Sequence, residues 1–585
     1  MYKESIVYNQ EAAKHLSSAA IKNIEIWQTD QKYKEFWPSI DKLIKDENWS
    51  ELEDSFFKIL EFGTAGRRGK VGAGCNRINT ITIGESVQAL ANYLRQVVPE
   101  TSHSVVIAYD TRNSSLELAR LAASVLAENN IQALLFSQYR STPELSFAVR
   151  HLKTSAGIVI SASHNPPQDN GIKIYWSDGA QISAPHDKNL MVLATEVSEF
   201  RAGNFEDNLR LGKIQLIDHQ VDDAYIETNA KLSLLDNHQI NIVYSPLHGT
   251  GTTNFLKTII RAGFNNISLV ESQMVADGNF PTIIDHKPNP ENLNANELAI
   301  EQLLSTKYDV AFTTDPDADR ICAMSLEKNG EVKSFTGNET AILVADYILK
   351  QKSERGQLDG RQYVVKTAVT TDALNALAQK YQVPIFDNML VGFKYIGKTI
   401  ERESQLNKEF IAGFEESLGQ LVGSQTRDKD AATGGLMIAE LAADLKVQGK
   451  TLGEKLNEIY QEIGHFYEKT LALEFPGADG FDKMAQTMAS ARSGQLDFSQ
   501  TAVLDYLSLV KTDVENNAIS SIDCIEAGNV VVFEFEHDHR KRITIRPSGT
   551  EPKLKIYIQW FAGSDDNFEN KLEEILNNFK ERILN

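Results

Sequence analysis

The amino-acid sequence predicts an α/β protein built from several domains. Short apolar segments of strand length alternate with amphipathic segments of helical spacing, and this alternation recurs in three successive blocks. Strand–helix–strand units of this kind form parallel or mixed sheets that helices cover. The chain has 585 residues and an ordinary globular composition, 42% hydrophobic and 24% charged. At about 150 residues per domain, we expect roughly four domains.

Each of the three α/β blocks contains a predicted strand, helix and second strand. These segments lie at 105–110, 116–129 and 133–137 in the first block, at 241–246, 253–264 and 267–272 in the second, and at 363–369, 372–381 and 384–388 in the third. The last part of the chain has strand-like segments at 529–536, 542–546 and 554–560, and a closing helix from Phe568 to Ile583. That mixture is typical of an α+β domain.

The changes of pattern divide the chain into five parts. The first 55 residues are polar and helical in pattern, and they carry none of the motifs described below. The predicted divisions are an N-terminal helical extension at 1–55 and domains I to IV at 56–212, 213–335, 336–460 and 461–585.

Charge and cysteine content exclude several classes of function. A net charge of -21 repels nucleic acid and anionic lipid, so neither is an expected partner. Cys75, Cys322 and Cys524 lie far apart and lack the spacing of a zinc site or a disulfide framework. No apolar core of signal-peptide length and no run of about 18 apolar residues occurs, so we expect no membrane span. We expect a cytoplasmic protein that is a monomer or weak oligomer.

A serine loop at 158–175 (IVISASHNPPQDNGIKIY) is the most informative motif. An apolar strand leads into Ser161, Ser163 and His164, and two prolines then prevent helix formation. A serine held beside a histidine can act as a nucleophile or phosphate carrier, and Lys173 returns on the following strand. The segment is also compatible with a simple turn. A Ser-His-Asp hydrolase is disfavoured because the GxSxG elbow is absent.

An aspartate loop follows an apolar strand at 308–325 (YDVAFTTDPDADRICAMS). Asp315, Asp317 and Asp319 alternate, so in an extended backbone they point the same way. Converging carboxylates repel one another, with Arg320 as a single partner, and a hard divalent cation such as Mg²⁺ would resolve the repulsion. An EF-hand is excluded because Arg320 stands at the sixth loop position. A solvated acidic turn is the alternative.

A third motif, RITIRPSGTEPKLKIY at 542–557, offers donors suited to a phosphate dianion. A guanidinium, two hydroxyls and free N–H groups at a glycine turn can bind its oxygens together. The residues are Arg546, Ser548, Gly549, Thr550 and Lys553. A hairpin turn with a solvated arginine is the alternative.

Two further loops carry weaker signals. FGTAGRRGKVGAGCNRIN at 62–79 is neither a Walker A loop nor a dinucleotide fingerprint, and Arg68 is a plausible phosphoryl contact or part of a flexible basic loop. IAGFEESLGQLVGSQTRDKDA at 411–431 places Glu415 and Ser417 where they could accept hydrogen bonds from sugar hydroxyls, with Arg427 and Lys429 close behind. A capped helix start is the alternative there.

Taken together and in this order, these loops resemble the α-D-phosphohexomutase superfamily. The resemblance is to its long-chain phosphoglucomutases, including the phosphoglucomutase/phosphopentomutase branch. It runs from about Phe62 to Tyr557. It is carried by FGTAGRRG, SASHNPPQDNGIKIY, TDPDADR, GFEESLG, RDKDA and RPSGTEP, with further similarity in AYDTRNSS, YSPLHGTGT and NMLVGFKYIG.

The resemblance implies three related α/β domains and a C-terminal α+β domain around one central cleft. Ser163 would be the phosphoserine and, with Asp315, Asp317 and Asp319, would bind one Mg²⁺ per subunit. The implied catalytic residues also include His164, Lys173, Lys429 and Arg68. The implied substrate-binding residues are Arg320, Gly392, Glu415, Ser417 and Arg427. The implied phosphate-binding residues are Arg546, Ser548, Gly549, Thr550 and Lys553.

The implied activity is interconversion of glucose 1-phosphate and glucose 6-phosphate. Phosphoserine and glucose 1,6-bisphosphate would be the intermediates, with the bisphosphate also serving as primer. Phosphopentomutase and phosphomannomutase activities are alternatives with the same mechanism. A metal-dependent phosphatase and a non-catalytic phosphosugar-binding protein are alternatives of other kinds.

Overall fold

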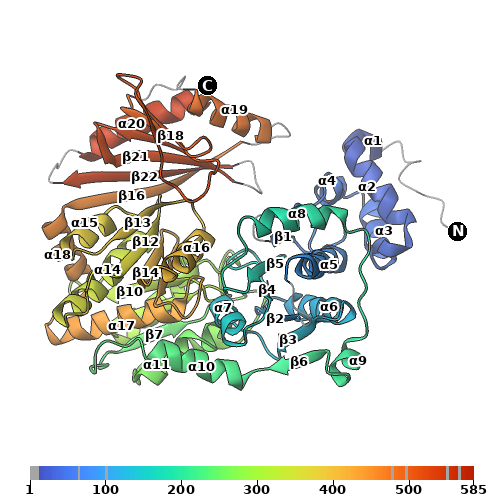
Figure 1. Cartoon of the computed structure of the whole chain (residues 1–585), viewed down its shortest axis with the longest axis horizontal. Helices are drawn as coiled ribbons and strands as arrows, with labels where there is room; N and C mark the ends of the chain where they lie inside the picture. Colours follow the sequence, from blue (N-terminus) through green and yellow to red (C-terminus); the bar gives the residue numbers. More distant parts are fainter. Residues whose placement is uncertain are drawn as a thin grey trace.

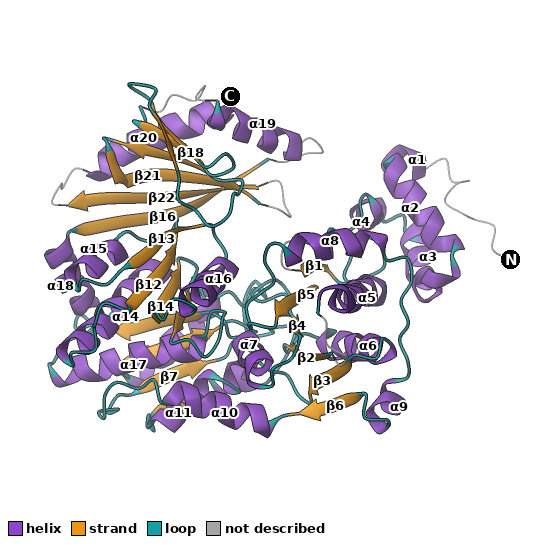
Figure 2. Ribbon diagram, viewed as in Figure 1, coloured by secondary structure: helices purple, strands orange, loops and turns teal. Residues whose placement is uncertain are grey.

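The computed structural model describes residues 12–584 except 64–65, 99–102, 476–479, 494–498, 549–552 and 564–567. The described chain forms a helical N-terminal segment, three domains built on mixed sheets and a C-terminal domain built on an antiparallel sheet (Figure 1). Helices pack around each sheet (Figure 2). The predicted fold class is confirmed. None of the helices in the described ranges is long and apolar enough to cross a bilayer.

The N-terminal segment is a small helical bundle that packs against domain I. It contains α1 (Ala12–His15), α2 (Ser18–Thr29), the 3₁₀ helix η2 (Gln31–Phe36), α3 (Trp37–Lys45) and α4 (Trp49–Phe56). Trp27 and Phe56 share one apolar cluster with Cys75 and Ile81 of domain I. Arg77 also pairs with carboxylates of α4, at 2.6 Å from Glu51. The helical extension is therefore built onto domain I.

Domain I has a six-stranded sheet in the order β1-β5-β4-β2-β3-β6. Its elements are β1 (Gly66–Lys70), α5 (Thr80–Val97), β2 (Ser104–Tyr109), α6 (Ser115–Glu128), β3 (Gln132–Phe136), α7 (Thr142–His151), β4 (Ala156–Ile160), β5 (Asp169–Trp176), α8 (His186–Glu196), α9 (Phe205–Arg210) and β6 (Ile214–Ile217). Val105 and Ile107 of β2 face the α5–α6 core, whereas Val106 and Ala108 face the α7 side. Burial on both faces explains why the strand is continuously apolar.

Domain II has a five-stranded sheet in the order β11-β10-β9-β7-β8. Its elements are α10 (His219–Ala230), β7 (Ile242–Ser245), η3 (Thr250–Thr252), α11 (Phe255–Ala262), β8 (Ile267–Leu269), α12 (Glu271–Met274), α13 (Leu293–Thr306), β9 (Val310–Thr314), β10 (Ile321–Leu326) and β11 (Val332–Ser334). The antiparallel pair β9–β10 presents the aspartate loop at its turn.

Domain III has a four-stranded sheet in the order β13-β12-β14-β15. Its elements are α14 (Gly337–Glu354), β12 (Gln362–Thr367), α15 (Ala373–Lys380), β13 (Ile385–Met389), α16 (Phe393–Ser404), β14 (Glu409–Glu415), β15 (Gly419–Val422), α17 (Ala431–Val447) and α18 (Leu452–Ile463). Glu415 and Gly419 pair across the turn that joins β14 to β15.

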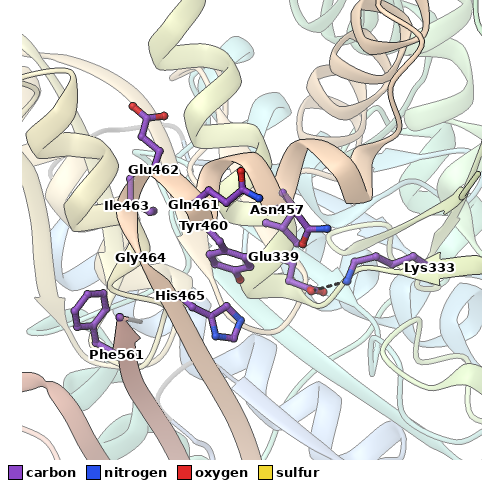
Figure 3. Close-up of a pocket in the computed structure, with 12 residues that line it drawn as sticks. Lys333, Glu339, Asn457, Tyr460, Gln461, Glu462, Ile463, Gly464, His465 and Phe561 are labelled. Atoms are coloured by element: carbon purple, nitrogen blue, oxygen red, sulfur yellow. Dashed lines mark hydrogen bonds and ion pairs between the residues drawn. The ribbon is translucent and has the colours of Figure 1, made fainter. Parts of the chain in front are cut away.

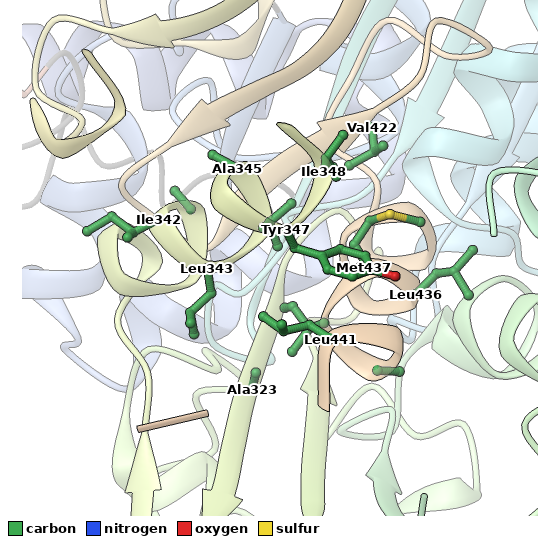
Figure 4. Close-up of a cluster of buried hydrophobic side chains, with 14 of the residues drawn as sticks. Ala323, Ile342, Leu343, Ala345, Tyr347, Ile348, Val422, Leu436, Met437 and Leu441 are labelled. Carbon is green, nitrogen blue, oxygen red and sulfur yellow. The ribbon is translucent and has the colours of Figure 1, made fainter. Parts of the chain in front are cut away.

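Domains II and III share one apolar core. Figure 4 shows Ile342, Leu343, Ala345 and Tyr347 of α14 close to Leu436, Met437 and Leu441 of α17, with Ala323 of β10 in the same cluster. Helix α17 is buried almost all round, as expected for a helix between two layers. At Gly435 a Cβ would lie 2.3 Å from the Phe255 side chain, so the helix approaches domain II too closely for a larger residue. This packing fixes the aspartate loop relative to the β14–β15 turn.

Domain IV is α+β, as predicted, with a seven-stranded antiparallel sheet in the order β16-β22-β21-β20-β17-β18-β19. Its elements are β16 (His465–Glu474), α19 (Gly480–Arg492), β17 (Ala502–Asp505), β18 (Val510–Asp513), β19 (Ile519–Ser521), β20 (Val531–Phe535), β21 (Asp538–Pro547), β22 (Lys553–Gly563) and α20 (Phe568–Leu584). Met488 of α19 and Phe579 of α20 pack in one core with Phe533 and Ile543 of the sheet.

Two of the predicted domain boundaries need correction. Strand β6 pairs in parallel with β3, so domain I extends through Ile217 and not only to residue 212. The strand was missed because it is only four residues long and its two central residues are exposed. The boundary at 460 falls inside α18, and the fourth sheet begins at His465. The predicted boundary at 335 falls between β11 and α14.

A buried ion-pair network joins domain IV to domain III. Arg542 of β21 lies 2.9 Å from the Asp372 carboxylate, and Lys366 lies 2.8 Å from it. Gln559 donates to the Thr370 carbonyl oxygen at 2.9 Å. Although burial opposes ionisation, Arg542 and Lys366 lower the pKa of Asp372 to about 2.

We expect Asp372→Asn to destabilise the protein by about 3–5 kcal/mol at pH 7, because two buried cations lose their partner. The depressed pKa means that the wild-type advantage is full above about pH 4 and shrinks as the pH falls toward 2. Calorimetric unfolding of both proteins across this range tests the expectation. The control is Asp359→Asn, which removes an exposed partner of Arg361 and should change little. Equal unfolding temperatures for wild type and Asp372→Asn at pH 7 would contradict the argument.

Candidate active site

The serine loop leaves the end of β4 and turns back into β5. Ser163 is 2% exposed and has a φ of 51°, an uncommon conformation for a residue with a side chain. Its N–H donates to Ser161 Oγ at 2.8 Å, which stabilises the turn. Its hydroxyl donates to Asp315 Oδ2 at 2.7 Å and lies 3.2 Å from His164 Nδ1. The hydroxyl of domain I thus touches a carboxylate of domain II.

The imidazole of His164 is half-buried and lies in a cationic environment. Burial and the nearby guanidinium groups of Arg320 and Arg68 lower the pKa of His164 well below its ordinary value. The ring is therefore neutral at pH 7. Arg68 comes from β1, which pairs with β5, and lies 3.4 Å from Asn165 in the serine loop.

The three aspartates converge, but on the turn between β9 and β10, where Ala318 has a φ of 50°, and not on the extended backbone that the sequence interpretation assumed. Asp315, Asp317 and Asp319 are buried, and their carboxylate oxygens lie within 4.8 Å of one another. Within the described chain, one buried oxygen of Asp317 and one of Asp319 have no hydrogen-bond partner. Orphaned buried oxygens are costly, and a hard cation with oxygen ligands would satisfy them. The donor set therefore fits Mg²⁺.

Cations from two other domains reach the aspartates. Lys173 of β5 lies 2.6 Å from Asp317 and 3.6 Å from Asp319. Lys429 lies 3.2 Å from Asp319 and 3.8 Å from Glu415. Burial alone would lower the pKa of each lysine, but the carboxylates raise it, so both remain charged. The sequence interpretation had counted Arg320 as the single partner, because it considered only the charges within the loop.

The β14–β15 turn is held against the aspartate loop. The Ile321 N–H donates to the Leu418 carbonyl oxygen at 3.3 Å, and Arg320 pairs with Gly419 as an isolated β-bridge. A Cβ at Gly419 would lie 2.2 Å from Cδ of Lys429, so only glycine lets that lysine approach. Burial and the neighbouring Glu415 raise the pKa of Glu416 to about 7.

These loops border one cleft of about 830 Å³ that residues from all four domains line. Most predicted site residues either line it or contact residues that do. The lining includes His164 and Gln181 of domain I, Glu291 and Arg320 of domain II, Gly392, Glu415, Ser417 and Lys429 of domain III, and Arg546, Lys555 and Tyr557 of domain IV. The Nε atom of Arg546 is buried without a hydrogen-bond partner in the described chain, so it is available to an anion.

Some predicted site residues are placed differently or fall outside the description. Arg427 does not line the cleft; its guanidinium donates to the carbonyl oxygens of Ser424 and Thr426. Lys553 pairs with Glu474 at 3.2 Å. The Ser548 N–H donates to the Lys553 carbonyl oxygen at 2.8 Å, beside the end of the β21–β22 pair. Gly549 and Thr550 lie outside the described residues.

The sequence interpretation missed three residues at the site. Lys555 lies opposite Arg546 in the β21–β22 pair, so both side chains project from the same face into the cleft. Its period-two spacing from Lys553 and Tyr557 was the available signal. Thr142 donates to Asp317 Oδ2 at 2.7 Å and Arg112 contacts the serine loop, but both depend on distant parts of the chain.

A second hollow, of about 860 Å³, lies at the seam where α18 meets domain IV (Figure 3). Tyr460, His465 and Phe561 line it, and its Lys333 is already paired with Glu339 at 2.9 Å. It contains none of the predicted site residues, so its size alone does not make it the candidate active site.

Comparison with known proteins agrees with this geometry. Three family models match, described as Phosphoglucomutase/phosphomannomutase, alpha/beta/alpha domains I, II and III, at residues 60–200, 223–328 and 336–463. The chain is 35% identical over 532 residues to a phosphoglucomutase of Staphylococcus haemolyticus, covering 90% of this chain and 94% of the relative. It is 34% identical over 559 residues to a phosphoglucomutase of Staphylococcus aureus strain MSSA476, covering 93% and 98%.

A solved structure shares the fold. The crystal structure of a putative phosphomannomutase from Thermus thermophilus aligns with a TM-score of 0.65 at 21% identity, covering 90% of this chain and 100% of that one. The predicted resemblance is thus confirmed: the chain is a member of the phosphoglucomutase/phosphomannomutase family, within the α-D-phosphohexomutase superfamily.

Proposed function

We propose that this phosphohexomutase is a phosphoglucomutase that interconverts glucose 1-phosphate and glucose 6-phosphate through a phosphorylated Ser163. The observation that carries the proposal is the 2.7 Å contact between Ser163 Oγ and Asp315 in the three-carboxylate cluster. A phosphate on that oxygen would border a cleft that Arg546 and Lys555 of domain IV also line. One cleft would therefore hold a phosphoryl donor and the second phosphate of a sugar.

In the proposed reaction, a free sugar hydroxyl attacks the phosphorus of phospho-Ser163. A new oxygen–phosphorus bond forms as the bond to Ser163 Oγ breaks, and glucose 1,6-bisphosphate results. The bisphosphate turns in the cleft and returns its other phosphate to Ser163, which releases the isomeric monophosphate. Mg²⁺ at the three aspartates would withdraw charge from the phosphoryl oxygens. Catalysis would rest mainly on positioning and electrostatic stabilisation.

The proposed roles of the other side chains follow from their charge. Neutral His164, whose Nδ1 lies 3.2 Å from Ser163 Oγ, is suited to hydrogen-bond with that oxygen and orient it. The proton that the attacking sugar hydroxyl loses would end on Ser163 Oγ when the bond to phosphorus breaks. Lys173 and Lys429 stay protonated and would stabilise the negative charge on the transferring group. Glu415 and Ser417, which line the same cleft, would accept hydrogen bonds from sugar hydroxyls.

The decisive test of the substrate is kcat/KM with Mg²⁺ for glucose 1-phosphate, mannose 1-phosphate and ribose 1-phosphate, each primed with glucose 1,6-bisphosphate. We expect at least about a tenfold preference for glucose 1-phosphate, because buried acceptors left unpaired penalise the wrong sugar. A preference for ribose 1-phosphate would retain the phosphoserine mechanism and reject glucose as the substrate. Phosphate release as fast as isomerisation would instead indicate a phosphatase.

Ser163→Ala is expected to abolish mutase turnover and leave the fold intact, because the phosphoryl carrier is lost while a buried methyl group remains. The assay follows glucose 6-phosphate formation, and intact mass spectrometry follows phosphorylation after priming. Ser155→Ala, at the other end of β4, is the matched control and should retain both signals. Mutase activity near the wild-type level in Ser163→Ala would refute the mechanism.

Asp317→Asn is expected to weaken Mg²⁺ binding by at least about 100-fold. Removing a residue that only hydrogen-bonds to a metal ligand typically lowers metal affinity about 10- to 100-fold. Asp317 is a candidate for a direct ligand, so its loss should lower the affinity at least as much. Isothermal titration calorimetry with MgCl₂ measures the affinity. Glu416→Gln, which removes a cleft carboxylate outside the cluster, serves as the control. Equal Mg²⁺ affinity in wild type and Asp317→Asn would place the metal elsewhere.

A further inference from the structure

We propose that Arg112 is a positioning residue that holds the serine loop in register with the aspartate loop, an inference that rests on the proposed function. Arg112 follows β2 in the segment AYDTRNSS and is 3% exposed. It does not line the cleft, so it has no direct role in substrate binding.

The guanidinium of Arg112 donates to four carbonyl oxygens of the serine loop. They belong to Ser163 at 2.6 Å, Pro166 at 2.7 Å and Asp169 at 2.9 Å, with Asn165 as the fourth. Pro166 and Pro167 lack N–H groups, so the loop has few donors of its own for these carbonyls. Without the guanidinium, the buried carbonyl oxygen of Ser163 and the part-buried ones of Asn165 and Asp169 would lose this donor, whereas that of Pro166 keeps the Asp169 N–H at 3.1 Å. A buried carbonyl oxygen without a donor is costly.

The geometry requires an arginine in particular. A guanidinium presents several N–H donors in one rigid plane, whereas an ammonium offers only three donors from a single point. The loop that it holds contains Ser163, whose φ of 51° is an uncommon conformation that the surroundings must impose. Binding the carbonyl oxygen of Ser163 itself fixes the residue whose hydroxyl is to be phosphorylated.

The charge of Arg112 is balanced inside domain I. Asp110 Oδ2 lies 3.2 Å from Arg112 Nε, and Asp110 Oδ1 accepts from the Arg112 N–H at 3.0 Å and from the Ser115 hydroxyl at 2.6 Å. A buried cation with its own buried anion adds little net field at the cleft. Arg112 therefore acts through its hydrogen bonds to the loop and not by attracting the phosphosugar.

The same residue also meets domain II, which carries the aspartates. The Phe280 ring centre lies 5.3 Å from the guanidinium carbon of Arg112. A Cβ at Gly278 would lie 2.7 Å from the Arg112 Cα, and Asn113 donates to Asn279 at 2.9 Å. The contact between Ser163 and Asp315 crosses this interface. Arg112 thus binds the loop that holds the hydroxyl and packs on the domain that holds the carboxylates.

The experiment compares Arg112→Lys with Arg77→Lys. Arg77 is also buried, but it pairs with Glu51 and Asp54 of α4, far along the chain from the serine loop. For Arg112→Lys we expect kcat to fall about 100-fold, because moving a reacting group by about 1 Å can lower the rate of the chemical step about 100-fold. KM for glucose 1-phosphate should stay within about twofold. Arg77→Lys should lower the unfolding temperature and leave kcat unchanged.

Hydrogen exchange of the amides at 161–170 gives a readout that needs no turnover. We expect faster exchange there in Arg112→Lys than in wild type or Arg77→Lys. If wild type shows no mutase activity, the proposed function fails, and this measurement still decides the role of Arg112. Should Arg112→Lys not fold, Phe280→Leu removes the ring from the guanidinium and should accelerate the same amides.

Two outcomes would overturn the inference. One is unchanged amide hydrogen exchange at 161–170 in a folded variant. This variant is Arg112→Lys with kcat within threefold of wild type, or Phe280→Leu if Arg112→Lys does not fold. The other is an increase in KM with unchanged kcat, which would make Arg112 a determinant of substrate binding.

Discussion

The architecture depends on a single electrostatic problem, the convergence of Asp315, Asp317 and Asp319 in a buried loop. Carboxylates at that separation repel one another strongly away from water. The loop supplies only Arg320, so the balance comes from Lys173 of domain I and Lys429 of domain III. The cluster is therefore stable only when three domains are assembled around it. The assembly that balances the charge also places cations where phosphoryl transfer needs them.

The way the domains are joined follows from that requirement. Domains II and III share a continuous apolar core, which holds the aspartate loop and the β14–β15 turn in one unit. Domain I approaches this unit through polar contacts, including Thr142 to Asp317 and Ser163 to Asp315. Domain IV docks through a small apolar cluster and the Asp372 network. Hydrogen bonds between domains thus position the site residues, while the apolar core shared by domains II and III supports them.

Local sequence patterns predicted the positions of individual helices and strands. Strands such as β2 and helices such as α6 lie within a residue or so of their predicted positions, because periodic burial determines them. The alternation of the aspartates predicted their convergence on an extended backbone, whereas the structure brings them together on the turn between β9 and β10. Contacts across domains left no such signal: Arg112 occupies a segment that reads as a turn, and its four carbonyl partners are about fifty residues away. Arg427 was predicted to bind substrate, but its guanidinium donates to the carbonyl oxygen of Ser424 in its own loop.

An acidic protein of the phosphohexomutase family needs local positive charge at its cleft, and several domains supply it. Lys173 and Lys429 contact the aspartate cluster that Ser163 touches, and Arg546 and Lys555 of domain IV line the same cleft as Lys429. The same lining offers Glu415 and Ser417, which are acceptors suited to neutral hydroxyls. In the proposed mechanism, a sugar with two phosphates would find cations for both in one cleft. Holding such an intermediate would favour exchange of phosphate between sugar positions over its loss to water.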